Sequence, residues 1–362
     1  MYPRLTINLK KLQHNLNAVA KITTKRNDFS LMIVTKGMCA DEEIVNLLLE
    51  DDIVSYLADS RIENIKTYSK KAFMKGKETV LLRLPMHSEI KEVVEYVGLS
   101  FNSEISTIKL LNEEAARQGK VHKILLMIDL GDLREGIFYT QEEKLFEIVE
   151  EILKLKNIEL LGVGVNLTCY GAIIPKNDNL SVLVDVAEKI EKKFNIEMKM
   201  RSGGNSSSLY LMLEDELPAG INNLRIGETF LLGTDTAYGG LIPGTVSDTL
   251  ILEAQIIELQ KKPSLPIGEI GVDAFGQTPH YEDKGDMIRA ILGIGKQDTD
   301  EGSMEPLDKK IDILGCSSDH FILDITNSDK EYNVGDIVSF EVGYGGMLKA
   351  ATSKYVKKDY IK

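Results

Sequence analysis

The chain has 362 residues, of which 43% are hydrophobic and only 9 are proline, a composition typical of a compact protein long enough for two domains. Its 43 basic residues are outnumbered by 56 acidic ones, and the net charge of −13 argues against a surface for nucleic acid or an anionic membrane. The three cysteines (Cys39, Cys169 and Cys316) form no CxxC pair, which indicates neither a disulfide framework nor a metal site. The N-terminus lacks a signal-peptide pattern and no apolar stretch approaches the roughly 20 residues of a membrane span, so we expect a cytoplasmic protein without a membrane partner.

Short apolar runs alternate with amphipathic helical stretches over the first two thirds of the chain. The eight runs that we expect to be strands are 31–36, 54–59, 79–84, 99–102, 122–131, 158–167, 197–204 and 222–228. Helices are expected between them, for example at 41–50, 103–118, 140–154 and 180–194. Eight strand and helix pairs over roughly 200 residues are typical of a (β/α)8 TIM barrel. A doubly wound open sheet would also alternate, but no glycine-rich dinucleotide turn follows the first strand.

The pattern changes after about residue 238, where glycine and proline interrupt short β-rich runs. These runs are 249–259, 287–295, 310–314, 320–325 and 336–342. The opening run 5–9 precedes the first helical stretch and falls outside the eight barrel strands. We therefore predict a barrel domain at 10–238 and a mostly β domain formed by 1–9 and 239–362.

Lys36 ends the first expected barrel strand and is followed at once by Gly37. A buried strand does not normally end in an ammonium group, although a lysine leaving the core to reach water would give the same pattern. A lysine at the mouth of a barrel can form a Schiff base, as the lysines that hold pyridoxal phosphate (PLP) do. The carboxyl ends of the other barrel strands should then supply groups for such a cofactor.

Two later strands end in groups that suit a phosphorylated ligand. The seventh ends in Arg201-Ser-Gly-Gly-Asn-Ser-Ser-Ser208, whose backbone N–H groups could bind an anion such as phosphate, although such clusters are often ordinary loops. The eighth contains Arg225 and Gly227; the arginine needs a partner, either an internal carboxylate or a ligand, and the glycine allows close approach of backbone to a ligand.

Together these features resemble the fold-type III PLP enzymes typified by alanine racemase, over essentially the whole chain. Within that family the sequence is most similar to the alanine/ornithine racemase branch. The strings that carry the resemblance are Val34-Thr-Lys36-Gly, Ala58-Asp59-Ser-Arg61-Ile-Glu-Asn64, Asn166-Leu-Thr-Cys-Tyr170-Gly, Ser202-Gly-Gly-Asn-Ser206-Ser-Ser, Leu224-Arg-Ile-Gly-Glu228 and Gly295-Lys-Gln-Asp298.

The resemblance implies a role for each matching position. Lys36 would hold PLP covalently, Arg225 would face its pyridine nitrogen and Arg134 its phenolic oxygen. The remaining cofactor contacts implied are those of Asn166 under the ring and of Gly204, Asn205, Ser206, Gly227, Glu228 and Tyr355 around the phosphate. The family is a head-to-tail homodimer, and Ser318 and Asp319 would meet the substrate carboxylate from the partner subunit.

The implied reaction is the racemisation of a small-molecule amino acid, with ornithine as the substrate and Lys36 as the base on one face. Acidic groups such as Asp319 and Asp298 could meet the distal ammonium of ornithine. Alanine, lysine and serine remain alternative substrates. A PLP-binding homeostasis protein and a decarboxylase of the same fold are further alternatives; the first lacks a trailing β domain, and the usual cysteine signature of the second is not evident.

The sequence departs from the family pattern at several positions. Ala40, Met127 and Asn166 stand where a tyrosine, an often carbamylated lysine and a histidine are usual. Where alanine racemases read Gly-Tyr-Ala-Asp, with the tyrosine as the second catalytic base, this chain has Lys296 in place of the tyrosine. We therefore expect Lys296 to be the second base, with a pKa lowered by burial. His320 and Tyr344 compete with it, and Lys296 could instead pair with Asp298 or with the phosphate.

Overall fold

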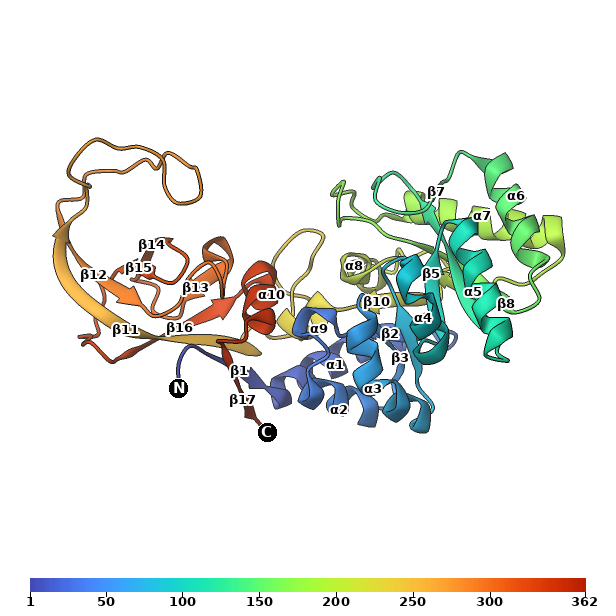
Figure 1. Cartoon of the computed structure of the whole chain (residues 1–362), viewed down its shortest axis with the longest axis horizontal. Coiled ribbons are helices and arrows are strands. Elements are labelled where there is room, and N and C mark those ends of the chain that lie inside the picture. Colours follow the sequence, from blue (N-terminus) through green and yellow to red (C-terminus); the bar gives the residue numbers. More distant parts are fainter. The chain divides into compact units, whose positions relative to one another are not determined.

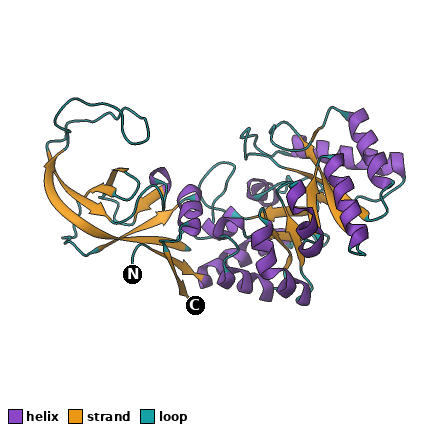
Figure 2. Cartoon of the chain, in the orientation of Figure 1, coloured by secondary structure: helices purple, strands orange, loops and turns teal.

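The structure is a computed structural model that describes residues 1–362, and the chain divides into two compact units. One unit is Leu12–Val246, and the other combines Met1–Lys11 with Ser247–Lys362. Helices surround the strands of the first unit, whereas the second consists mainly of strands (Figures 1 and 2).

The first unit is built on a closed sheet of parallel strands. Its strands are β2 (Ser30–Val34), β3 (Val54–Asp59), β4 (Glu78–Leu81), β5 (Leu99–Asn102), β6 (His122–Asp129), β8 (Ile158–Val165), β9 (Met200–Ser202) and β10 (Asn223–Ile226). The pairings of β10 with β2 and of β5 with β6 close the ring, and the short β7 (Ile137–Phe138) lies beside β6. The predicted (β/α)8 barrel is thereby confirmed, and all strands point their carboxyl ends to the same side.

Amphipathic helices cover the outside of this sheet (Figure 2). They are α1 (Leu9–Thr23), α2 (Glu42–Glu50), α3 (Ile62–Met74), α4 (Ile90–Tyr96), α5 (Ile105–Arg117), α6 (Glu142–Leu153), α7 (Asn177–Phe194), α8 (Leu209–Leu213) and α9 (Glu228–Leu232). In α7 the buried residues Leu180, Leu183, Ala187 and Ile190 recur at the three- and four-residue spacing of a single helix face.

The interior of the barrel is packed with side chains and is not a channel. Alternate residues of the strands point inward, as in the pairs Met32 and Val34, Leu99 and Phe101, and Leu125 and Met127. Ala58, Val80, Leu161 and Met200 complete this buried cluster. Because apolar side chains fill the centre, polar groups are concentrated where the strands end.

The second unit is a mostly antiparallel eight-stranded sheet, which confirms the expected β domain. Its strands are β1 (Arg4–Asn8), β11 (Leu250–Pro263), β12 (Asp286–Leu292), β13 (Met304–Pro306), β14 (Asp312–Cys316), β15 (Phe321–Asp324), β16 (Ile337–Val342) and β17 (Lys357–Ile361), with one helix, α10 (Tyr344–Thr352). The opening strand β1 pairs antiparallel with β11 and parallel with β17. The N-terminal run therefore belongs to this sheet and not to the barrel ring.

Several strands end earlier than the sequence indicated, and at two of these ends the difference concerns a predicted site residue. Strand β2 stops at Val34, and Lys36 begins a short 3-10 helix, η1 (Lys36–Met38), because Thr35 turns out of the strand with φ −94° and ψ −11°. Strand β10 stops at Ile226, and Glu228 is the first residue of α9. Both residues therefore lie just beyond the strands, in short helices at the carboxyl end of the barrel.

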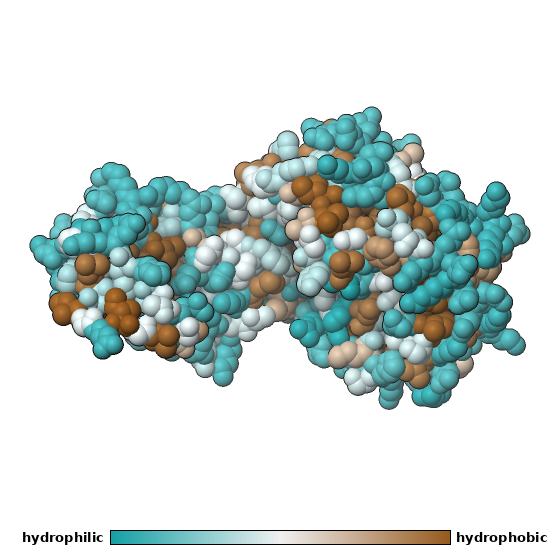
Figure 3. Space-filling model, turned by 90° about the horizontal axis from the view of Figure 1, so that it is seen from above, coloured by the Kyte–Doolittle hydropathy of each residue, from teal (hydrophilic) through white to brown (hydrophobic).

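Hydrophilic residues cover most of the face of each unit that Figure 3 shows, with hydrophobic residues in smaller patches between them. No helix of the structure is both long and apolar enough to cross a membrane.

His122 makes a pH-dependent contribution to the stability of the barrel. It is 3% exposed at the start of β6, its Nε2 lies 2.8 Å from Ser100 Oγ, and burial lowers its pKa from 6.5 to about 4. The folded chain therefore binds fewer protons here than the unfolded chain, and stability falls as the pH drops from about 6.5 toward 4. We expect a loss of about 2 kcal/mol between pH 7 and pH 5, measured by urea unfolding.

In the His122→Gln variant this part of the pH dependence should disappear. The matched control is His280→Gln, since His280 is exposed and should leave the slope unchanged. Equal slopes for the wild type and His122→Gln would contradict the assignment.

Candidate active site

Lys36 is held at the carboxyl end of β2 by contacts with the neighbouring strand. Thr35 donates its N–H to Ala58 O at 2.8 Å and its hydroxyl to Asp59 Oδ2 at 2.7 Å. The two non-glycine residues Cys39 and Ala40 then take left-handed conformations, with φ of 54° and 51°, which return the chain toward α2. The lysine side chain thus projects from a turn that the β2 and β3 ends hold in place.

Two other predicted site residues, Arg134 and Arg225, influence the pKa of Lys36. Burial lowers the pKa of Lys36, Arg134 and Arg225 lower it further, and Cys169 and Asp59 act in the opposite direction. Burial also raises the pKa of Asp59, which the hydrogen bond from Thr35 opposes. A lysine with a lowered pKa is a better nucleophile and base near neutral pH than an exposed one.

Arg225 is a buried guanidinium whose hydrogen-bond acceptors are neutral. It is 4% exposed, Nη1 donates to Ser202 Oγ at 2.8 Å and Nη2 to Val165 O at 2.7 Å. Its guanidinium carbon lies 5.2 Å from the centre of the Phe101 ring. Burial lowers the pKa of Arg225 to about 10, and Glu135 partly offsets this, so the group remains charged at neutral pH. Neither hydrogen bond goes to the internal carboxylate considered above.

Asn166 and Asn205 connect the loops that follow β8 and β9. Asn205 Nδ2 donates to Leu167 O at 2.9 Å and to Asn166 Oδ1 at 3.3 Å. Cys169 Sγ also donates to Asn166 Oδ1, at 3.4 Å. Asn166 is 6% exposed, and its Nδ2 is buried with no hydrogen-bond partner. A buried amide donor without an acceptor costs free energy, and a ligand atom would remove that cost.

The predicted phosphate loops after β9 and β10 lie against each other. Ser206 Oγ accepts from Gly227 N at 3.1 Å and from Thr229 N at 3.3 Å. Gly204 has φ +111°, and a Cβ there would lie 2.7 Å from Ser208 Oγ, so both conformation and space require glycine. Glu228 accepts from Thr234 Oγ1 at 3.2 Å, and burial raises the pKa of Glu228.

The end of β6 and the loop after it carry Arg134 together with three acidic residues. Arg134 forms a two-point ion pair with Glu135. Burial lowers the pKa of Arg134, but Glu135 and, more weakly, Cys169 and Asp132 raise it, with a net increase. Asp129 caps the loop itself, since its Oδ1 accepts from Gly131 N at 2.8 Å and Leu133 N at 3.1 Å.

The β unit contains the other predicted site residues and brings some of them together. Lys296 N donates to Ser317 O at 2.9 Å, Gln297 N donates to Ser318 O at 3.2 Å, and Gln297 Nε2 donates to Asp319 Oδ1 at 3.0 Å. A Cβ at Gly295 would lie 2.3 Å from Ser318 O, so this close approach needs a glycine. Lys296, Ser318 and Asp319 are thus neighbours.

In the single chain the pKa of Lys296 is raised, the opposite of the shift expected from burial beside a partner's barrel mouth. Its Nζ pairs with Glu301 Oε1 at 3.2 Å and lies 4.1 Å from the centre of the Phe275 ring. The hydrogen bond to Glu301 raises the pKa of Lys296 because it stabilises the ammonium. The partner is therefore Glu301, and neither Asp298 nor a phosphate is needed to pair it.

Asp298 and Tyr355 are linked through Ser353. Asp298 is 6% exposed and accepts from Ser353 Oγ at 2.6 Å, and Ser353 Oγ accepts from Tyr355 N at 3.1 Å. The Tyr355 side chain is 56% exposed in this chain. Of the two carboxylates expected near a distal ammonium, Asp298 is enclosed whereas Asp319 is exposed.

Sequence reasoning overlooked Asp132 and Glu135 and did not recognise Ser202 as the partner of Arg225. The first two belong to the string Asp129-Leu-Gly-Asp132-Leu-Arg134-Glu135-Gly136, in which three carboxylates follow a buried strand. That density of charge at a strand end was the available signal. Ser202 gave none of its own, because a serine before two glycines is common in loops.

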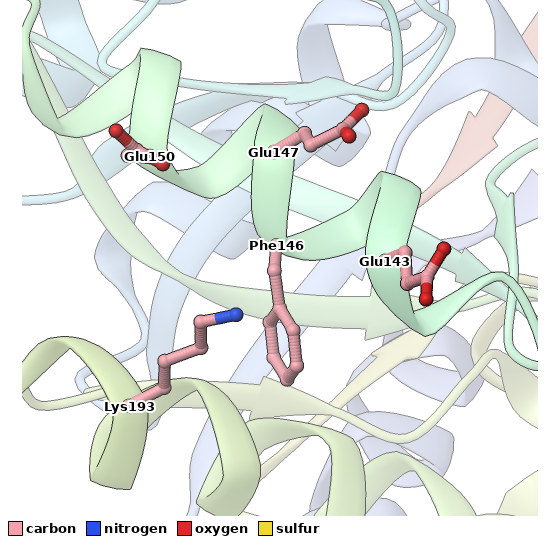
Figure 4. Close-up of a pocket in the computed structure, with 5 residues that line it drawn as sticks. All are labelled: Glu143, Phe146, Glu147, Glu150 and Lys193. Carbon is pink, nitrogen blue, oxygen red and sulfur yellow. The ribbon is translucent and has the colours of Figure 1, made fainter.

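A surface pocket between α6 and α7 contains none of these residues. Glu143, Phe146, Glu147, Glu150 and Lys193 line it, and Lys193 points toward the Phe146 ring (Figure 4), with Nζ 3.8 Å from the ring centre. The contact is a cation–π interaction between two helices, which stabilises their packing. No group of three or more His, Cys, Asp or Glu side chains in the structure is arranged to hold a metal ion.

Solved structures share this combination of a barrel and a β unit. Alanine racemase from Clostridium difficile 630 aligns with a TM-score of 0.72 and 18% identity, covering 100% of this chain and 96% of that one. A crystal structure of alanine racemase from Bartonella henselae with covalently bound pyridoxal phosphate aligns with a TM-score of 0.74 and 17% identity, covering 100% of both. The fold is therefore that of the alanine racemases.

Comparison of the sequence with known proteins identifies the family. Residues 7–234 match the model described as alanine racemase, N-terminal domain. The chain is 52% identical to ornithine racemase of Acetoanaerobium sticklandii over 362 residues, 100% of both chains. It is 38% identical to lysine racemase of Thermotoga maritima over 360 residues, 99% of both. The chain belongs to the alanine racemase family, which confirms the resemblance noted in its sequence.

Ser202 should contribute measurably to stability because it satisfies a buried charge. Ser202→Ala removes the acceptor of Arg225 Nη1, and a hydrogen bond to a charged group is worth about 1.5–3 kcal/mol, so we expect a loss of that size in the unfolding free energy of the barrel. The measurement is denaturant unfolding of the cofactor-free protein.

The matched control is Ser69→Ala in α3, since Ser69 Oγ is buried without a hydrogen-bond partner. Removing the Ser69 hydroxyl should therefore change the unfolding free energy little. Equal effects of the two substitutions would show that Ser202 does not satisfy Arg225.

Proposed function

We propose that this protein is a PLP-dependent racemase that interconverts L- and D-ornithine. The observation that carries the proposal is Lys36, a partly buried ammonium with a lowered pKa at the carboxyl end of the first barrel strand, within electrostatic reach of Arg134 and Arg225. The full-length similarity to an ornithine racemase supports the substrate.

The barrel residues fit this cofactor. The unpaired Asn166 Nδ2 is a donor without an acceptor, and the Nη atoms of Arg225 are used by Ser202 and Val165 while Nε remains for a ring nitrogen. Ser206 and Glu228 are the first residues of η3 and α9, where N–H groups lack intrahelical acceptors and can donate to phosphate oxygens. We propose that these groups, with Gly204, Asn205 and Gly227, hold the cofactor in the barrel, and that Tyr355 reaches the phosphate.

In the proposed mechanism Lys36 moves a proton at one face of the substrate. When bound, PLP supplies an electron sink for the negative charge left on the α-carbon. The lowered pKa of Lys36 lets its amine accept the α-proton of one enantiomer near neutral pH, and in the reverse direction the protonated amine donates a proton to the α-carbon from the same face. Arg225, with a pKa of about 10, keeps its own proton and donates only a hydrogen bond to the ring nitrogen.

A distal ammonium on the substrate is supported by two relatives, which are named for ornithine and for lysine. Asp319 is an exposed carboxylate beside Ser318 and can accept from such an ammonium. We propose that Ser318 and Asp319 contact the substrate. Lysine is the second candidate substrate, while alanine and serine lack the distal charge.

A cofactor-homeostasis protein is the alternative of another class. It would need the lysine strand and the phosphate loops but no eight-stranded β unit, which this chain has. The full-length match to racemases also favours the enzyme over that protein and over a decarboxylase.

We propose that two chains form a head-to-tail homodimer in which the β unit of each completes the other's barrel site. Lys296 would then be the base for the opposite face. Its ion pair with Glu301 opposes this role, because it raises the pKa of Lys296 in the single chain, so groups of the partner barrel must lower it. His320 and Tyr344 are the competing bases.

We also propose a cytoplasmic location, which is supported by Cys39, Cys169 and Cys316, none of which forms a disulfide. Cell fractionation that recovers the protein with the envelope would contradict it.

Lys36→Ala should abolish covalent cofactor binding and racemase activity together. The measurement is the visible absorbance of the purified protein, followed by borohydride reduction and peptide mapping, which should label Lys36 in the wild type. Lys77→Met is the control, because Lys77 is a buried lysine, at 9% exposure, that lies just before β4 and donates to Asp51 O and Val54 O. A borohydride-stable label on any other lysine would refute the assignment.

Ornithine should be preferred over alanine by about ten- to a hundredfold in kcat/KM, the value of one charge-assisted hydrogen bond. Initial rates with L-ornithine, L-lysine, L-alanine and L-serine, read by chiral chromatography, test this. Asp319→Asn should reduce the preference while sparing turnover of alanine. Faster turnover of alanine than of ornithine would overturn the substrate and leave the racemase intact.

Mixing two inactive variants tests the shared site and Lys296 together. Lys36→Ala and Lys296→Met chains, each inactive alone, should form hybrid dimers with one intact site, so that activity returns to about a quarter of the wild-type value. Refolding each variant alone is the control. Full activity of Lys296→Met would remove this residue from the reaction, and a mixture without recovery would place both groups in one chain's site.

A further inference from the structure

Asp132 connects two loops at the barrel mouth that are far apart in the sequence. It lies in the loop after β6, and its carboxylate accepts three backbone N–H groups from the loop after β8. Oδ2 accepts from Tyr170 at 3.1 Å, and Oδ1 accepts from Gly171 at 3.1 Å and from Ile173 at 3.4 Å. Asp132 is 0% exposed, whereas the donor residues lie in an exposed loop, so the three bonds are partly buried. Hydrogen bonds to a carboxylate are stronger than those between neutral groups.

The backbone on both sides of this contact is shaped to permit it. Leu133, Thr168 and Ala172 all have left-handed conformations, with φ of 59°, 70° and 54°, which non-glycine residues adopt only when the surroundings compensate. A Cβ at Gly171 would lie 2.8 Å from Asp132 O, so the loops approach as closely as they do only because residue 171 is glycine. The contact therefore rests on the carboxylate and on the glycine independently.

Each loop carries a residue of the proposed cofactor site. Arg134 lies two positions after Asp132, and Asn166 begins the segment that reaches Tyr170 and Gly171. Asn166 is fixed further by Asn205 and Cys169, but those contacts do not involve the loop after β6. Asp132 therefore connects the Arg134 loop directly to the segment that begins at Asn166.

We propose that Asp132 is a positioning residue whose carboxylate fixes the Arg134 loop against the Asn166 loop and thereby sets the slot that receives the cofactor ring. This inference rests on the proposed function. The inference extends the proposed function to a residue that touches neither cofactor nor substrate and that acts through Arg134 and Asn166.

Asp129, the last residue of β6, is a matched comparison for Asp132. It too is a buried carboxylate that accepts backbone N–H groups, but those of the loop directly after it, Gly131 and Leu133. Loss of Asp129 should loosen one loop, whereas loss of Asp132 should separate two.

The first measurement is amide hydrogen exchange of the full-length protein without cofactor, resolved to single amides. Asp132→Ala should speed exchange at Tyr170, Gly171 and Ile173 by about tenfold or more. Asp132→Asn keeps one acceptor oxygen and should give a smaller increase. In Asp129→Asn the faster amides should be Gly131 and Leu133, with those of the other loop unchanged. Unchanged exchange at 170–173 in Asp132→Ala would overturn the inference.

The second measurement follows cofactor affinity and catalysis. PLP titration of Asp132→Ala, read by visible absorbance, should show a Kd about ten- to a hundredfold weaker, with partial rescue in Asp132→Asn. Asp132→Ala should weaken cofactor binding and lower kcat more than it changes the KM for the amino acid. Gly171→Ala should reproduce this behaviour with the carboxylate intact, and Gly302→Ala, where a Cβ meets no atom within 4 Å, is its control.

The outcomes separate the two proposals. If exchange rises but PLP affinity, absorbance and kcat stay at wild-type values, Asp132 is structural only and the inference fails while the proposed function stands. If the wild type binds no PLP, the proposed function fails, and with it the cofactor role of Asp132; the exchange result then reports only on the loop contact.

Discussion

The buried guanidinium of Arg225 organises the barrel end on which the candidate site depends. It extends from β10, donates to Ser202 on β9 and to Val165 on β8, and lies over Phe101 of β5. Removing one partner of a buried charge costs far more than the pair contributes net, so these strand ends are held in one arrangement. Because Ser202 and Val165 accept only from Nη1 and Nη2, the same cation keeps its Nε donor for a ligand.

The polar residues of the candidate site lie at the carboxyl ends of the strands because apolar side chains fill the interior of the barrel. Apolar side chains from seven strands fill the centre, including Met127 at a position where the family often has a lysine. Polar groups that follow the strands therefore share one rim, where Lys36 and Arg134 affect each other's charge. The low dielectric of that rim lowers the pKa of Lys36, which turns an ordinary ammonium into a usable base.

The sequence predicted the architecture well because apolar periodicity reports which strand faces are buried. It located the eight barrel strands, and the strings around Lys36, Asn205 and Arg225 indicated the family. It could not show that Asp132 reaches across to Tyr170, since a contact between residues 38 positions apart depends on the fold. The ion pair that raises the pKa of Lys296 in the single chain was not predictable for the same reason, because Glu301 is brought near Lys296 only by the turn between β12 and β13.

The most direct test of the central claim is the fate of the α-proton. The holoenzyme is incubated with L-ornithine in D2O, and the amino acid is followed by proton NMR and chiral chromatography. The account predicts D-ornithine that carries deuterium at Cα, with carbon dioxide and keto acid absent. Retention of the Cα proton, or release of carbon dioxide as the main product, would contradict a racemase built on Lys36.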